Sequence, residues 1–235
     1  EIYALREKVM DVLEIISGYR VNYSMNCIGG VNRDITDPDT VLAAVREIRA
    51  GIEKTIIPIF TANRTILART RGVGVLSRED AVAYGVVGPI ARASGLAIDV
   101  RQDFSYAAYE ELGFKIVTQD TCDVMARVVV RALEMLESCR LIEKALLELP
   151  GGPRRPSELV TVIPAGEAVA RVEAPRGEVV YYLKSDGSDT PVRVKIRTPS
   201  DLNIPSVRAM ARGQALGDMA IIQASVDPCC SCTDR

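Results

Sequence analysis

Apolar residues recur every three to four positions along much of the first half of the chain, the spacing that places them on one face of an α-helix. The stretch 2–16 has this pattern and stops before Gly18, a residue type that commonly ends helices. A second stripe follows Asp37, a capping residue that precedes a proline, and continues to Ile56. The pattern therefore predicts two long amphipathic helices, with Pro58 kinking or ending the second.

A third helical stripe covers residues 125–146 and stops at the Pro-Gly-Gly-Pro sequence of residues 150–153. We expect Asp120 or Thr121 to cap this helix. A shorter helix is expected over residues 77–85, where a serine three positions ahead of a carboxylate can satisfy free backbone amides.

After residue 152 the apolar period changes to two, which is typical of strands. The segments expected to be strands are 159–163, 167–173, 178–183 and 192–196. Asp186 and Gly187 between the last two predict a hairpin turn. Two further helices are expected, over residues 204–212 and 216–224. An extended tail should begin at Ser225.

These elements predict an α+β fold, with a long-helix bundle over residues 1–152. A small antiparallel sheet, helices and a C-terminal tail follow over residues 153–235, and we expect both parts to form one structural unit. The chain starts with Glu1 in the middle of a helical pattern, which indicates a fragment of a longer protein.

Composition narrows the chemistry that this chain can perform. Of 235 residues, 48% are hydrophobic and 26% charged, enough to bury a core, and the net charge of −2 argues against nucleic acid as a partner. The chain has no histidine, which excludes His-based triads and His-ligated metals within it. No apolar run approaches the roughly 20 residues of a spanning helix, so we expect a soluble or peripheral protein.

Cysteines supply the clearest candidate site. Cys229 and Cys232 form a Cys-x-x-Cys pair near the C-terminus, a spacing that lets two thiolates converge on one metal. By itself the pair is ambiguous: half of a zinc site, a redox disulfide and two free thiols are all compatible with it, and the two functional alternatives together are favoured. Cys230 between them is expected to be a packing residue. The remaining cysteines are expected to be core thiols: Cys27, Cys122 and Cys139, the latter two on a helical stripe.

Two separate motifs resemble those of [NiFe]-hydrogenase large subunits. The tail Asp-Pro-Cys-Cys-Ser-Cys of residues 227–232 resembles the Asp-Pro-Cys-x-x-Cys signature that ends these subunits, and residues 173–177 resemble their Glu-Ala-Pro-Arg-Gly segment. Further segments are similar to the energy-converting, membrane-bound hydrogenases and to the homologous quinone-reacting 49 kDa subunit of respiratory complex I: 29–34, 77–80, 88–95 and 179–200. The resemblance covers nearly the whole chain and suggests the C-terminal two-thirds of such a subunit.

The resemblance implies reversible H2 oxidation and proton reduction at a nickel–iron centre whose iron carries CO and cyanide. It makes Cys229 a terminal nickel ligand that can also accept a proton, and Cys232 a bridge between nickel and iron. Since only two of the four soft ligands that nickel needs are here, an N-terminal part must supply the others, and this chain alone should be inactive. Termination at Arg235 is similar to a maturation-processed end, although a stop codon or a chosen end would look identical.

A canopy above the metal is also implied. Arg176, next to Pro175, matches the arginine over the open metal position, where a guanidinium can stabilise developing charge or hydrogen-bond a diatomic ligand. Asp227 matches the carboxylate that orients this arginine, and Ser225 matches a hydroxyl that can donate to cyanide. Simple alternatives are a strand-end surface arginine and an Asp-Pro turn. Glu173 occupies the family position but is also explained as a solvated strand residue.

Two residues in a Gly/Pro-rich turn, Arg92 and Ser94, are similar to the family's and are equally compatible with a structural role. The resemblance implies an iron–sulfur small subunit as electron acceptor, complex I-like membrane subunits, a ferredoxin as carrier and a place on the cytoplasmic side of the cell membrane. Quinone reduction and a metal-free assembly scaffold are the alternatives. The hydrogenase interpretation is favoured because a quinone-reacting relative has lost the two thiols that this chain keeps, Cys229 and Cys232.

Overall fold

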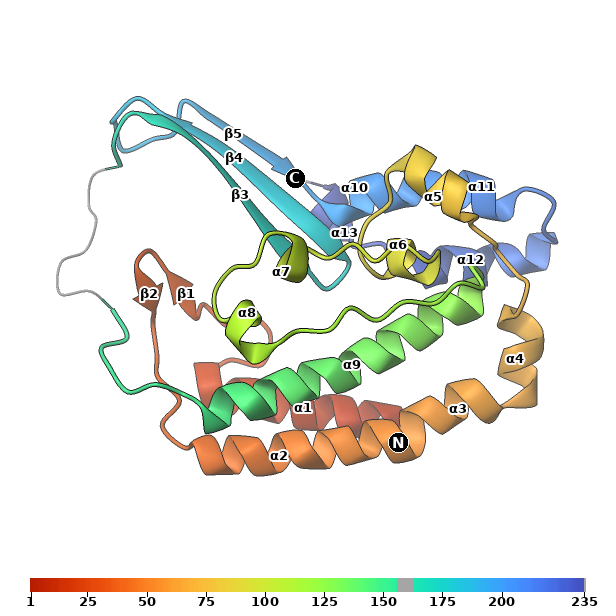
Figure 1. Ribbon diagram of the computed structural model, residues 1–235, viewed down its shortest axis with the longest axis horizontal. Coiled ribbons are helices and arrows are strands. Elements are labelled where there is room, and N and C mark those ends of the chain that lie inside the picture. Colours follow the sequence, from red (N-terminus) through yellow and green to blue (C-terminus); the bar gives the residue numbers. More distant parts are fainter. Residues whose placement is uncertain (156–162, 235) are drawn as a thin grey trace.

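The computed structural model describes residues 1–155 and 163–234. Its helical layer is built from α1 (Ile2–Ser17), α2 (Pro38–Gly51) and α9 (Val124–Leu147), which lie side by side along the molecule (Figure 1). Their apolar faces meet in one cluster: Val12, Val41, Val45, Ile48, Ile52, Ile56 and Cys139. The predicted bundle of long helices is confirmed.

The second predicted helix does not end at Pro58. A π-helical segment, Ile52–Ile56, carries it into α3 (Ile57–Ala62), and Pro58 occupies the first turn of α3. The amide of Ile57 donates to the carbonyl of Ile52, five residues earlier, which is a π-helical hydrogen bond. This wider turn lies directly before Pro58, which has no amide to donate.

Short elements connect the long helices. They are β1 (Asn26–Cys27), β2 (Gly30–Val31), α4 (Arg64–Thr70), α5 (Arg78–Tyr84), α6 (Pro89–Ala93), α7 (Val100–Asp103) and α8 (Tyr109–Leu112). The predicted helix over 77–85 is confirmed as α5, since the hydroxyl of Ser77 accepts the amide of Asp80 and Gly85 ends the helix in a left-handed conformation.

The predicted cap of the third long helix is wrong. Neither Asp120 nor Thr121 caps α9, because Cys122 adopts a left-handed φ of 62° and moves the helix start to Val124. Asp123 is the cap and accepts the amide of Ala126 at 2.8 Å.

The sheet contains β3 (Gly166–Ala174), β4 (Gly177–Ser185) and β5 (Arg193–Arg197), antiparallel in that order. Three of the four expected strands are therefore confirmed. Of the fourth, at 159–163, residues 159–162 lie outside the described residues, and Ile163 is not in a strand. The predicted Asp186-Gly187 turn lies in the connection between β4 and β5. A second, tighter hairpin joins β3 to β4, because Ala174 pairs with Gly177 and leaves only two residues in the turn.

The C-terminal part folds back over the end of the helical layer and the base of the sheet (Figure 1). Its elements are α10 (Pro199–Asn203), a 3-10 turn (Ile204–Ser206), α11 (Val207–Ala211), a second 3-10 turn (Leu216–Asp218), α12 (Met219–Val226) and α13 (Cys230–Thr233). A second apolar cluster, which includes Leu76, Ile90, Val124, Met210 and Ile222, joins α11 and α12 to α6 and α9.

The expectation of an extended tail from Ser225 is wrong. Ser225 and Val226 are the last turn of α12, and the tail forms the short helix α13. Asp227 ends α12 in a left-handed conformation at φ 55°, ψ 56°, and Pro228 prevents the helix from continuing. Among the described residues, no helix has the length and apolarity needed to cross a membrane.

Candidate metal centre at the C-terminal tail

The two-residue turn between β3 and β4 consists of Pro175 and Arg176 and lies beside the C-terminal tail. Pro175 fixes one backbone angle of the turn, and Gly177 behind it has a φ of 129°. A Cβ on Gly177 would lie 2.8 Å from the backbone nitrogen of Gly88, so only glycine permits this close approach. The backbone of the turn is therefore fixed against the loop that precedes α6.

The side chain of Arg176 binds Asp227 through both backbone and carboxylate. Its Nε donates to the backbone oxygen of Asp227 at 2.7 Å and lies 3.1 Å from carboxylate Oδ2, while a terminal nitrogen donates to Oδ1 at 3.2 Å. These contacts orient a planar guanidinium next to the tail cysteines. The structure thus brings together Arg176 and Asp227, which the sequence resemblance had paired.

Cys229 and Cys232 lie close together in the tail, Cys229 directly before α13 and Cys232 within it. The amide of Cys229 donates to the hydroxyl of Ser200 at 3.2 Å, and Thr198 donates to the backbone oxygen of Cys232 at 2.7 Å. Hydrogen bonds with Ser231 and Cys232, together with the charge of Arg176, lower the pKa of Cys229 to about 7. Burial, followed by the proximity of Cys229, raises the pKa of Cys232. The site therefore favours the thiolate at Cys229.

The structure places Ser225 differently from the role that the resemblance implies. Its hydroxyl donates to the carbonyl of Ile222 at 2.6 Å and accepts Nε of Arg127 at 2.9 Å. Arg127 is fully buried and also donates to the carbonyl of Gly74 at 2.7 Å. The Ser225 hydroxyl would have to leave Ile222 before it could donate to a metal-bound ligand.

Ser200 and Thr198 are the site hydroxyls that sequence reasoning missed. Both are buried, and both hold the backbone of the cysteine-bearing tail. They flank Pro199 at the start of α10, and the Thr-Pro-Ser sequence is typical of an ordinary helix start. No signal in a single sequence distinguishes them from capping residues.

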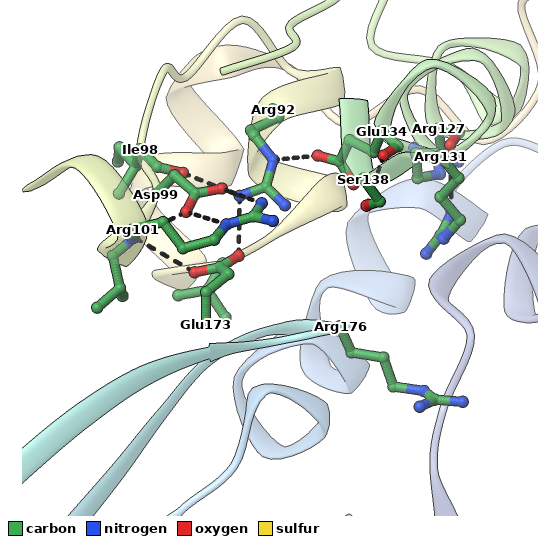
Figure 2. Close-up of polar contacts among 12 residues, drawn as sticks. Arg92, Ile98, Asp99, Arg101, Arg127, Arg131, Glu134, Ser138, Glu173 and Arg176 are labelled. Atoms are coloured by element: carbon green, nitrogen blue, oxygen red, sulfur yellow. Dashed lines mark hydrogen bonds and ion pairs between the residues drawn. The ribbon is translucent and has the colours of Figure 1, made fainter. Parts of the chain in front are cut away.

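A buried ionic cluster lies near the end of β3 that leads into the hairpin turn (Figure 2). Arg92 on α6 is bound by three carboxylates: Glu134 of α9 at 2.6 Å, Asp99 at 2.8 Å and Glu173 of β3 at 2.9 Å. Arg101 binds Asp99 through two parallel contacts at 2.6 and 2.8 Å. Side-chain exposure is 2% for Arg92, 0% for Asp99 and 4% for Glu173. The cluster ties three helical segments to the strand that leads to Arg176.

Glu173 is thus a buried ion-pair partner and not a solvated strand residue. Burial, as the largest effect, raises the pKa of its carboxyl, while the charge of Arg92 opposes that rise. Ser94, which the sequence pairs with Arg92 in the Gly/Pro-rich turn, is buried, and its hydroxyl donates to the carbonyl of Leu76. The contacts of both side chains are with other parts of the fold, Arg92 and Val100 for Glu173 and Leu76 for Ser94.

The remaining cysteines are separate from the tail. Cys139 is in the helical core, as expected. Cys122 is in the turn before α9 and Cys27 in β1, both partly exposed, so the expectation that these two are core thiols is wrong. Cys230 is exposed, so the expectation that it is a packing residue is also wrong. Within residues 1–155 and 163–234, no group of three or more Cys, His, Asp or Glu side chains is arranged to hold a metal. The two tail thiols fit one half of a thiolate metal centre.

Known proteins with similar sequences are components of oxidoreductases. The chain is 42% identical to the carbon monoxide-induced hydrogenase of Rhodospirillum rubrum, over 98% of this chain and 64% of the relative. It is 40% identical to the alpha subunit of the membrane-bound hydrogenase of Pyrococcus furiosus, over 98% of this chain and 58% of the relative. It is also 38% identical to a subunit of the NADH-quinone oxidoreductase of Herpetosiphon aurantiacus, over 94% of this chain and 62% of the relative.

The protein is accordingly an oxidoreductase-family subunit. Residues 2–159 and 157–235 match the profile of the respiratory-chain NADH dehydrogenase 49 kDa subunit, and the chain belongs to that family. The chain spans less than two thirds of the length of the three relatives.

Proposed function

We propose that this chain is the catalytic large-subunit portion of an energy-converting [NiFe]-hydrogenase, which interconverts H2 with protons and electrons. The observation that carries the proposal is the pair of adjacent thiols, Cys229 and Cys232, next to a guanidinium that Asp227 holds in place. A quinone site has no need of paired soft ligands, whereas nickel and iron do.

In this proposal Cys229 and Cys232 hold one side of a nickel–iron centre, and the N-terminal part of the large subunit supplies the other thiolates. The bound centre would polarise H2 and make it acidic. Cys229, a partly exposed residue, would accept the released proton at Sγ. Arg176, set in place by Pro175 and Asp227, presents donors and positive charge to the face where charge develops. Ser225 could contribute a hydrogen bond to cyanide only after rotation away from α12.

The proposed partners follow from the same function. Electrons would leave through an iron–sulfur cluster of a small subunit, with a ferredoxin as the external carrier. Complex I-like membrane subunits would anchor the assembly on the cytoplasmic side of the cell membrane. This arrangement agrees with the name of the Pyrococcus furiosus relative, which is part of a membrane-bound hydrogenase.

Quinone reduction is the second candidate, because a relative at 38% identity is named as part of an NADH-quinone oxidoreductase. A metal-free assembly scaffold is the third. Metal analysis of the natively purified complex, coupled with infrared spectroscopy in the region of metal-bound CO and cyanide, separates them. Nickel together with those bands is the expected result. An intact complex that has neither would contradict the hydrogenase proposal and leave the other two.

A further inference from the structure

The side-chain amide of Asn203, at the end of α10, joins two distant parts of the chain. Its Oδ1 accepts the amide of Val87 at 2.9 Å, while its Nδ2 donates to the carbonyl of Val87 at 3.3 Å and to the carbonyl of Arg176 at 3.2 Å. Asn203 is 1% exposed. A carboxamide supplies an acceptor and two donors in one plane, and all three are used here.

The segments that Asn203 joins are also in direct backbone contact. A Cβ on Gly88 would lie 2.4 Å from the carbonyl oxygen of Arg176 and 2.5 Å from Cα of Gly177. The carbonyl oxygen of Arg176 also accepts a hydrogen bond from Asn203. The loop before α6 and the hairpin turn are therefore in close backbone contact and are also joined by the hydrogen bonds of Asn203. The backbone of Arg176 is therefore held by contacts separate from those of its guanidinium.

We infer that Asn203 is a positioning residue for Arg176, fixing the backbone from which the guanidinium reaches Asp227 and the tail. The inference rests on the proposed hydrogenase function. Two attachments define where the guanidinium lies: Asn203 at the backbone and Asp227 at the side chain. Because a misplacement of about 1 Å can cost about 10²-fold in rate, the backbone attachment would set how well the guanidinium could act on a metal centre held by the tail cysteines.

The test uses the natively purified complex with Asn203→Asp, which keeps an acceptor for Val87 but loses both donors. Asn203→Ser, which keeps one donor, is prepared beside it so that a failure of the aspartate variant to assemble leaves the comparison intact. Asn63→Ala is the matched control, since Asn63 caps α4 with two hydrogen bonds away from the turn. Hydrogen–deuterium exchange of the hairpin peptide and the infrared bands of CO and cyanide are measured, together with H2-dependent dye reduction in wild-type and Arg176→Met backgrounds.

The expected result for Asn203→Asp is faster exchange of the hairpin peptide with slow exchange kept at Val87, shifted infrared bands, and about tenfold to 10²-fold slower dye reduction. In the Arg176→Met background the same substitution should have little further effect, because residues that act as a unit are not additive. Equal rate losses in both backgrounds, or unchanged exchange and bands, would overturn the inference. If wild type lacks nickel and the bands, the hydrogenase proposal fails, and hairpin exchange still reports whether Asn203 holds Arg176.

Discussion

Arg176 binds Asp227 twice, through the backbone oxygen at 2.7 Å and through the carboxylate at 3.1 Å. Asp227 has a left-handed φ of 55°, a conformation that costs most non-glycine residues about 1–2 kcal/mol and that Asp tolerates better than most. The bonds from Arg176 offset that cost and hold the turn that leads into the cysteine tail. A residue of the β3–β4 turn thus helps to set the direction in which the tail leaves α12.

Replacement of Arg176 by lysine should reduce activity far more than stability. An ammonium group is a point charge and cannot make the parallel contacts of a guanidinium. We expect H2-dependent dye reduction to fall by about 10²-fold, the scale of losing one stabilising donor. Thermal unfolding should shift by only a few degrees, since Arg176 is partly exposed. Arg193→Lys on the exposed strand β5 is the control. Activity of Arg176→Lys within twofold of wild type would refute the proposed catalytic role of the guanidinium.

Replacement of Gly88 by alanine should displace the hairpin turn. Gly88 has a φ of 69° and its new Cβ would meet the backbone of Arg176 at 2.4 Å. Gly85→Ala is the matched control, because Gly85 has a φ of 63° with no atom within 4 Å of the new Cβ. We expect a loss of about 1 kcal/mol for Gly85→Ala, the backbone cost alone, and about 2–4 kcal/mol for Gly88→Ala, where overpacking adds to it. Equal losses in denaturant unfolding would show that the contact is not tight.

Removal of the Arg92 guanidinium should be among the most destabilising single changes in this chain. Arg92→Met keeps the apolar stem but leaves Asp99 and Glu173 buried without their shared cation. Breaking a buried ion pair from one side costs about 3–5 kcal/mol. Denaturant unfolding measures the loss, with exposed Arg193→Met expected to stay within about 0.5 kcal/mol of wild type. A loss below about 1 kcal/mol for Arg92→Met would mean that the carboxylates repack or become neutral at little cost.

The stability of the fold should depend on pH through Glu173. Burial raises the pKa of this carboxyl in the folded state, so the folded chain binds more protons than the unfolded chain above about pH 4.3. The free energy of unfolding contributed by Glu173 therefore falls as pH rises from that value through the folded pKa. Glu173→Gln removes the titration and should flatten this part of the profile. The difference between the two unfolding profiles is the measurement, and parallel profiles would contradict the predicted direction.

Local signals explain why most of the fold could be predicted. The stripes of α1, α2 and α9 and the alternation of β3, β4 and β5 record burial on one face, and burial is what the sequence pattern reports. The cap of α9 was misplaced because Asp120, Thr121 and Asp123 are all suitable capping residues, and the choice depends on the backbone of Cys122. Which of the three caps the helix is therefore decided by the three-dimensional fold and not by the local sequence.

The candidate site could be predicted only where a motif carried it. Arg176, Asp227 and the tail cysteines were found through resemblance, and the fold places them together. The supporting contacts of Ser200 and Asn203 were not found, since each is formed with backbone atoms far away in sequence. Every residue type except proline offers the same backbone donor and acceptor, so these contacts leave no complementary residue type in the sequence that a pattern could reveal.

The three tail cysteines offer the sharpest separation of metal binding from stability. We expect Cys229→Ser and Cys232→Ser to abolish nickel retention, because a serine hydroxyl is a hard ligand that nickel and iron bind poorly. Cys230→Ser is the matched control: Cys230 is exposed, lies between the other two, and should retain nickel and activity. Each change removes one sulfur from α13 or from Cys229, the residue that precedes it, so thermal unfolding of the three metal-free chains should agree within a few degrees. Nickel measured by mass spectrometry in each purified complex decides the matter. Nickel retained at wild-type levels in Cys229→Ser would remove Cys229 from the metal centre, and nickel lost equally from Cys230→Ser would trace the effect to tail structure and not to ligation.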